Sequence, residues 1–277
     1  MAARPGVGAN LQEHPTFSLS GYIPAEKRLP ESLRRHIHIG LRWSSGVEGC
    51  PPEDMHMVAV CKTGWHPVGK RLGSLLNWVN KAYSRGRVSL YAGDPGREPR
   101  VEFDMLQDER DVERMKVGVR RMASLLQSPA LRETLLDPFP SSYSERVRDL
   151  GRYCTKNKVL TTILAGMLDG PAPLRRALID KLITEGPTLT EALADDAVLA
   201  EVVKAGSHGV WHCSCTCRMG GRDDPDAVVD SAGRVYGVAG LRVVDASVMP
   251  VTPRANTNLP TIMIAEKMSD HILATAQ

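Results

Sequence analysis

Hydrophobic and polar residues alternate in short runs along the first hundred residues. Apolar positions recur every second residue in these runs, which is typical of strands with one buried face. Polar segments marked by proline and glycine separate them. The pattern predicts a sheet built from non-adjacent strands at residues 16–23, 36–43, 55–60, 86–91 and 100–103.

From residue 108 the apolar spacing changes to three and four residues, which indicates a helix. The positions that recur are Val112, Met115, Val119, Met122 and Leu125. A proline-rich break follows at 137–140, and further helices are predicted at 144–153, 158–168, 173–183 and 189–204. The segment 141–186 is either a lid over a binding site or an insertion that only packs, and we slightly favour the second.

Near the C-terminus a strand pattern and a helix pattern follow each other. Residues 241–244 are apolar and mostly β-branched, lie between Gly240 and Asp245, and predict a buried strand. A helical stripe then begins with Pro260 in its first turn and Asn258 placed to cap it. Because the start of a helix carries unpaired N–H groups and positive dipole, it favours a neighbouring anion.

Composition and charge narrow the class of protein only slightly. The 277 residues are 42% hydrophobic and 24% charged, enough for one or two domains with a core. The net charge of +3 comes from scattered bases and predicts no nucleic-acid partner. No run of eighteen apolar residues and no signal-peptide pattern occurs, so we expect no membrane partner and a cytoplasmic location.

Three of the six cysteines form a C-x-C-x-C run, Cys213, Cys215 and Cys217. With His208 or His212 this run suggests a zinc site, although structural zinc usually uses C-x2-C spacing and a fourth ligand. Packing of small residues explains the run better, and we predict no metal site.

Several blocks resemble the C-terminal end of the glucose-methanol-choline (GMC) family of FAD-dependent oxidoreductases. Residues 212–220 read H-x-x-x-T-C-R-M-G, residues 237–250 read G-V-x-G-L-R-V-V-D-A-S-V-M-P, and residues 256–267 read N-T-N-x-P-x-I-M-I-A-E-K. Residues 6–15, G-V-G-A-N-L-Q-E-H-P, resemble the family block G-x-N-L-Q-D-H, with Glu13 in place of the usual Asp. Residues 84–90 resemble its S-R-G-x-V-x-L block.

The resemblance also implies that a part of the enzyme is absent from this chain. In complete members the N-L-Q-D-H block follows a dinucleotide-binding βαβ unit with a G-x-G-x-x-G turn. Here no such turn follows a strand pattern. We therefore interpret the sequence as the C-terminal half of such an enzyme, from a truncated gene, a fragment or a split protein.

The implied fold class is α/β in two parts. Residues 1–12 would be a remnant of the FAD-binding domain, and residues 13–205 an α+β substrate-binding domain with an antiparallel sheet. Residues 206–277 would return to the FAD-binding domain.

The resemblance also implies the site and its chemistry. His212 matches the family's catalytic histidine, a base that takes the alcohol proton while hydride passes to flavin N5. A lone histidine, taken by itself, is more often a satisfied structural residue. Asn256 matches the second active-site position, which would hold the substrate oxygen. The positions that match residues beside the FAD are Asp245, Ala246, Thr257 and Asn258.

Two other classes of function stay open. The function that the resemblance implies first is that of an FAD-dependent oxidoreductase acting on the CH–OH group of an alcohol. The first alternative is a catalytically incomplete fragment or pseudoenzyme that binds no FAD alone. The second is a hydroxynitrile lyase, which keeps the flavin without using its redox capacity. The expected partners are a small alcohol, with a weak preference for a primary aryl or furan alcohol, and the missing N-terminal half.

Overall fold

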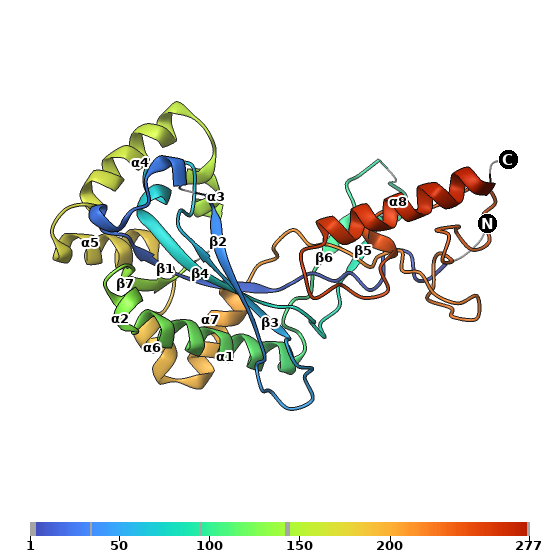
Figure 1. Cartoon of the computed structure of the whole chain (residues 1–277), viewed down its shortest axis with the longest axis horizontal. Coiled ribbons are helices and arrows are strands. Elements are labelled where there is room, and N and C mark those ends of the chain that lie inside the picture. The colour runs from blue at the N-terminus through green and yellow to red at the C-terminus, as the bar shows by residue number, and fades with distance from the viewer. Residues whose placement is uncertain (1–3, 34, 95, 142–144, 276–277) are drawn as a thin grey trace. The chain divides into compact units, whose positions relative to one another are not determined.

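The computed structural model describes residues 4–33, 35–94, 96–141 and 145–275, which form two compact units (Figure 1). Unit 1 comprises Met1–Pro15, Asn80–Asp111 and Gly209–Gln277, and unit 2 comprises Thr16–Val79 and Val112–His208. The boundaries between the units at 15/16 and 208/209 lie near the predicted ones at 12/13 and 205/206. Residues 80–111, which the prediction placed with the middle of the chain, belong to the same unit as the two terminal segments. That unit 1 binds the flavin and unit 2 the substrate stays a prediction.

A five-stranded antiparallel sheet in the order β2-β3-β4-β1-β7 is the centre of unit 2 in its described residues. The strands are β1 (Thr16–Tyr22), β2 (Ile37–Trp43), β3 (Met55–Val60), β4 (Leu72–Val79) and β7 (Leu136–Pro140). The predicted strands at 16–23, 36–43 and 55–60 are confirmed. The sequence did not indicate β4, whose residues L-G-S-L-L-N-W-V do not alternate between apolar and polar, or β7, an edge strand within the proline-rich break.

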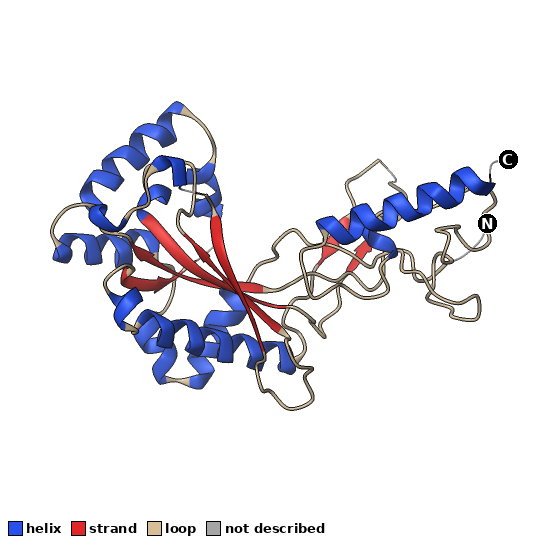
Figure 2. Cartoon of the chain, in the orientation of Figure 1, coloured by secondary structure: helices blue, strands red, loops and turns tan. Residues whose placement is uncertain are grey.

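Helices lie on both sides of this sheet (Figure 2). They are α1 (Glu109–Leu126), α2 (Pro129–Arg132), α3 (Glu145–Gly151), α4 (Thr155–Leu168), α5 (Ala172–Leu178), α6 (Leu189–Ala194) and α7 (Asp196–Gly206). The single helix predicted at 189–204 is two helices, because Asp195 adopts extended backbone and its carboxylate accepts the N–H groups of Ala197 and Val198.

The helices pack against the sheet through two sets of side chains. On α1, the predicted stripe from Val112 to Met122 is fully buried. On α4 and α5, Leu168 and Leu178 join Tyr22 and Phe139 in a second cluster. The described part of the segment 141–186 thus packs on the sheet through this cluster, and the choice between a lid and an insertion that only packs stays a prediction.

Gly118 lets α1 approach β4 closely. A Cβ atom at this position would lie 2.3 Å from Nδ2 of the buried Asn77. We expect Gly118→Ala to lower the free energy of unfolding by about 1–3 kcal/mol, although alanine is the better helix former. The matched control is Gly166→Ala in α4, where nothing lies within 4 Å, which should stabilise by about 0.5–1 kcal/mol. Urea unfolding measures both, and equal effects of the two substitutions would contradict the close contact.

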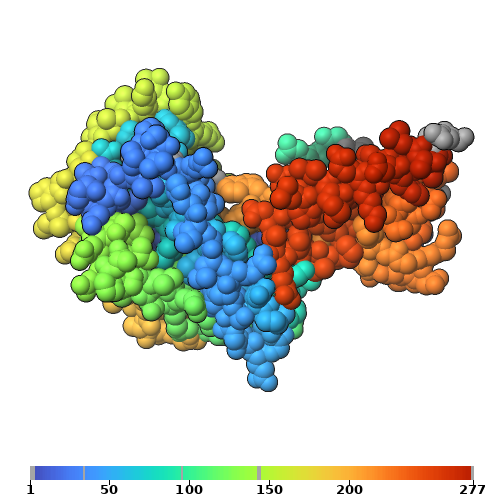
Figure 3. All heavy atoms as spheres, in the orientation of Figure 1, coloured from blue at the N-terminus to red at the C-terminus, as the bar shows by residue number. Residues whose placement is uncertain are grey.

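Unit 1 has less regular structure. The strands β5 (Arg87–Ser89) and β6 (Arg100–Glu102) form an antiparallel pair, shorter than predicted, and α8 (Asn258–Thr275) follows the last loop. Asn258 is the first residue of α8 instead of its cap. The surface of α8, red in Figure 3, exposes Leu259, Ile262, Met263 and Leu273. Among the described residues no helix is both long enough and apolar enough to cross a membrane.

The predicted strand at 241–244 is wrong. Only an isolated bridge between Arg234 and Arg242 pairs this run, and Leu241 is 50% exposed. A strand requires a continuous ladder of backbone partners, whereas the backbone bonds of this run among the described residues are the two that form the bridge, from the Val235 N–H to the Leu241 carbonyl and from the Val243 N–H to the Gly233 carbonyl. An apolar run without such partners stays irregular.

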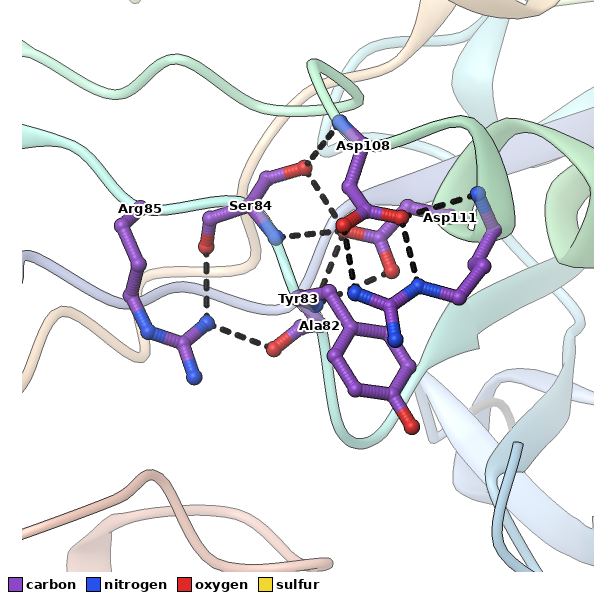
Figure 4. A network of polar contacts seen from close by, with 7 residues as sticks. Ala82, Tyr83, Ser84, Arg85, Asp108 and Asp111 are labelled. Atoms are coloured by element: carbon purple, nitrogen blue, oxygen red, sulfur yellow. Dashed lines mark hydrogen bonds and ion pairs between the residues drawn. The ribbon is translucent and has the colours of Figure 1, made fainter. Parts of the chain in front are cut away.

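A buried carboxylate fixes the segment that resembles the S-R-G block (Figure 4). Asp111, near the start of α1, accepts the N–H groups of Tyr83 and Ser84 and the Ser84 hydroxyl at 2.6–3.0 Å. Two residues further on, Gly86 and Leu11 exchange both backbone hydrogen bonds at 2.9 Å. The S-R-G segment thereby positions the N-terminal stretch that leads to His14.

The observed architecture combines helices with an antiparallel sheet, and the predicted α/β fold class is confirmed.

Candidate active site

His14 and His212 meet in unit 1 although 198 residues separate them in sequence. The backbone bridge between Gln12 and Ser214 brings the two segments together. The Nδ1 atoms lie 2.8 Å apart, and the rings meet edge to face with 5.0 Å between their centroids. Both side chains are buried, so this contact is a hydrogen bond shielded from water.

The partners of His14 determine which nitrogen of His212 carries a proton. Nε2 of His14 lies 3.0 Å from the Pro253 carbonyl, which can only accept, so a neutral His14 is protonated at Nε2 and has a lone pair at Nδ1. His212 must then donate from its Nδ1–H, which leaves the lone pair on Nε2. The Nδ2 amide of Asn256 lies 3.2 Å from that Nε2. His212 therefore presents an unprotonated Nε2 beside an amide donor.

Burial keeps both rings neutral near pH 7. It lowers the pKa of His14 to about 4, and the neighbouring His212 lowers it further while the carbonyls of Pro253 and Asn80 oppose the change. Burial also lowers the pKa of His212. Since a base needs an unprotonated lone pair, this environment keeps His212 in the neutral form that can accept a proton.

Glu13 ties the backbones of the two histidines to each other. Its Oε1 accepts the His14 N–H at 2.7 Å, and its Oε2 accepts the His212 N–H at 2.8 Å. Burial nevertheless raises the pKa of this carboxyl, because the backbone donors only partly replace water. A Cβ on Gly209 would lie 2.8 Å from Glu13 Cγ, so glycine leaves the space that the glutamate occupies.

Glu13, His14 and His212 also hold one potential ligand atom each within 4.8 Å of one another. The two Nδ1 atoms already share a proton at 2.8 Å, and both Glu13 oxygens accept backbone N–H groups. Hydrogen bonds thus account for all three groups, and we propose no metal there.

The three neighbouring thiols also lack the character of metal ligands. Burial raises the pKa of Cys213, Cys215 and Cys217, that of Cys213 to about 11 beside Glu13, whereas metals bind the thiolate. Cys215, at a position where the family often has glycine, adopts a left-handed φ of 76°. This is a conformation that glycine reaches at lower cost.

Thr252 anchors the loop that carries Pro253 and Asn256. It is 1% exposed, its N–H donates to Gln12 Oε1 at 3.1 Å, and its hydroxyl accepts from Ser214 Oγ at 3.0 Å. The loop is thereby joined to both segments that carry the histidines.

The four predicted cofactor residues fall into two groups. Thr257 and Asn258 follow Asn256 directly at the start of α8, where Thr257 is buried and Asn258 is exposed. Asp245 is exposed and accepts the Ser247 N–H at 2.7 Å, and the Ala246 carbonyl accepts the Cys215 N–H at 3.2 Å. The structure therefore brings Asn256 to His212 directly, and joins Asp245 and Ala246 to the site through the backbone near Cys215.

The sequence interpretation missed Glu13 and His14 as parts of the site. The signal was present, because both residues end the block at 6–15 that resembles the family pattern. A sequence block cannot show that its histidine, His14, contacts His212.

Comparisons with known proteins identify the family of this chain. The family model described as GMC oxidoreductase matches residues 82–265. A 5-(hydroxymethyl)furfural oxidase of Methylovorus sp. (strain MP688) is 38% identical over 280 residues, which cover 100% of this chain and 45% of the relative. Oxygen-dependent choline dehydrogenase 1 of Chromohalobacter salexigens is 29% identical over 97% of this chain and 44% of its own length.

Solved structures show the same fold. The crystal structure of pyridoxine 4-oxidase from Mesorbium loti matches with a TM-score of 0.66 and 20% identity, over 98% of this chain and 44% of that one. A fungal aryl-alcohol oxidase matches with a TM-score of 0.63 and 18% identity, over 98% of this chain and 48% of that one. The chain thus spans slightly less than half the length of the relatives it matches. Its sequence blocks, its fold and the family model agree, and the chain belongs to the GMC oxidoreductase family.

Proposed function

We propose that this chain is the C-terminal part of an FAD-dependent oxidoreductase that acts on the CH–OH group of an alcohol. The observation that carries this proposal is the hydrogen-bonded series from the Pro253 carbonyl through His14 and His212 to Asn256. It fixes a neutral imidazole with its lone pair at Nε2 beside an amide donor. That is the arrangement needed to take the proton of a hydroxyl group.

His212 takes this proton, and His14 stabilises the ring that has taken it. The Nε2 atom of His212 accepts it, and the positive charge that develops on the ring is stabilised because Nδ1–H already donates to His14. The lowered pKa of His14 keeps that acceptor neutral. Asn256 carries two amide hydrogens, so it can donate to the substrate oxygen as negative charge develops there.

The residues near the start of α8 fit a flavin. Asp245 and Asn258 offer exposed polar side chains, and the first N–H groups of α8 add donors with the positive end of the helix dipole. This mixture of donors and acceptors suits the polar edge of a flavin ring, and we propose that Asp245, Ala246, Thr257 and Asn258 hold it. When bound, FAD supplies the two-electron acceptor for the carbon-bound hydrogen.

The upstream half of the enzyme is part of this proposal. The relatives are more than twice as long as the matched region, and we propose that a dinucleotide-binding unit from that half completes the FAD site. A relative that is 38% identical is named 5-(hydroxymethyl)furfural oxidase, which supports a primary aryl or furan alcohol as substrate.

The test is anaerobic bleaching of the flavin. The chain is combined with FAD and the upstream half, oxygen is removed, and 5-(hydroxymethyl)furfural is added. We expect the visible flavin band to bleach, because the alcohol is oxidised as the flavin is reduced. The matched control is 2-methylfuran, which has the ring but no hydroxyl and should leave the band unchanged.

Other results would assign the other functions. A bound flavin that no alcohol bleaches, together with cleavage of a cyanohydrin, would identify a lyase. Failure to retain FAD even with the upstream half would identify a pseudoenzyme.

A further inference from the structure

Lys81 is a cation of unit 1 that the proposed chemistry does not use. It follows β4 and is half-buried, and its ammonium donates to the Thr252 carbonyl at 2.5 Å. Burial lowers the pKa of Lys81, and the neighbouring cations Arg254 and Arg85 lower it further. The Lys81 ammonium thus binds a backbone oxygen of the loop that carries Pro253 and Asn256.

The bond from Lys81 completes the set of contacts that hold Thr252. Gln12 binds its N–H, Ser214 binds its hydroxyl, and Lys81 binds its carbonyl. The next carbonyl along the chain, that of Pro253, is the one that fixes the protonation of His14. The proline ring fixes φ of Pro253, so an anchored Thr252–Pro253 peptide restricts where the following Pro253 carbonyl points, and with it the ring of His14.

We propose that Lys81 is a positioning residue of the site, which holds the Thr252 carbonyl and thereby keeps the Pro253 carbonyl and Asn256 in register with His14 and His212. The inference rests on the proposed function for its catalytic consequence, but its structural part concerns only this chain. A second effect is electrostatic. The positive charge of Lys81 disfavours a proton on His14, in the same direction as burial and His212 and against the carbonyls of Pro253 and Asn80.

The first experiment measures the histidine rings in the chain as it is, without flavin. With ¹⁵N-labelled histidine, NMR reports which ring nitrogen is protonated, the pKa of each ring and the exchange rate of the proton between the Nδ1 atoms. In Lys81→Met we expect the pKa of His14 to rise and that proton to exchange at least tenfold faster. Lys81→Arg, which keeps a donor and the charge, should restore the original values.

The matched control is Lys267→Met on α8. Lys267 is exposed in the same unit, so its substitution removes the same charge and should leave the two rings unchanged. Equal histidine signals in Lys81→Met and Lys267→Met would overturn the proposal. So would a lower free energy of unfolding in Lys81→Met with unchanged rings, because that result describes a purely structural lysine.

The second experiment measures flavin reduction in the FAD-loaded enzyme. Lys81→Met should lower kcat about tenfold with little change in KM, because misplaced groups slow the chemical step more than binding. Unchanged kcat with altered rings would overturn the catalytic part alone. Failure of the proposed function gives a different result, since no variant, including the unaltered chain, would then reduce flavin with an alcohol.

Discussion

His212→Ala is expected to slow alcohol-dependent flavin reduction by about 10²–10⁴-fold while FAD stays bound, as for loss of a general base. The structure gives the reason. Nε2 of His212 carries the lone pair, and the hydrogen bond from its Nδ1–H to His14 Nδ1 fixes the orientation of the ring. Alanine removes the proton acceptor, and Asn256 cannot replace it because an amide is not a base at neutral pH.

Rapid mixing of the oxidised, FAD-loaded enzyme with the alcohol under anaerobic conditions measures this rate directly. The control is His271→Ala on α8, which removes an exposed histidine of the same unit and should leave the rate unchanged. Bound flavin is quantified from its visible absorption in each variant. A His212→Ala enzyme that reduces flavin at the original rate would remove His212 from the mechanism.

Much of the site was predictable because its residues lie within compact sequence blocks. His212 and Asn256 each occupy a position that the family resemblance identifies, and the structure places their side chains in contact. His14 and Glu13 lie in another block, but nothing in a hydrophobic pattern reports that two rings 198 residues apart share a proton. Lys81 carries no sequence signal at all, because its role depends on one backbone carbonyl of a distant loop.

The fold was predictable where apolar and polar residues alternate along the sequence. β3 was found with the correct bounds, whereas the sequence of β4, L-G-S-L-L-N-W-V, does not alternate and β4 was not found. The opposite error occurred at 241–244, where β-branched residues suggested a strand. Local composition reports the preference of a segment, but the pairing partners decide whether the strand forms.

Arg114→Met is expected to lower the free energy of unfolding of unit 2 by about 3–5 kcal/mol, the usual cost of breaking a buried ion pair. Arg114 on α1 and Asp54 before β3 are both fully buried, with Nη1 and Oδ2 3.5 Å apart. Asp54 also accepts the N–H and the hydroxyl of Ser45 at 2.7 Å. Methionine fills much of the volume of the arginine but leaves the carboxylate without its counter-charge in a site that water does not reach.

Urea unfolding followed by tryptophan fluorescence measures this loss, because Trp43, Trp65 and Trp78 all belong to unit 2. The control on the same helix is Arg120→Met, which breaks an exposed pair with Asp196 and should cost no more than about 1 kcal/mol. A double variant, Arg114→Met with Asp54→Leu, should recover part of the loss by removing the uncompensated charge. Recovery should stay incomplete, because the Ser45 N–H then loses its acceptor. If Arg114→Met and Arg120→Met cost the same, the buried pair does not stabilise the contact between α1 and the sheet.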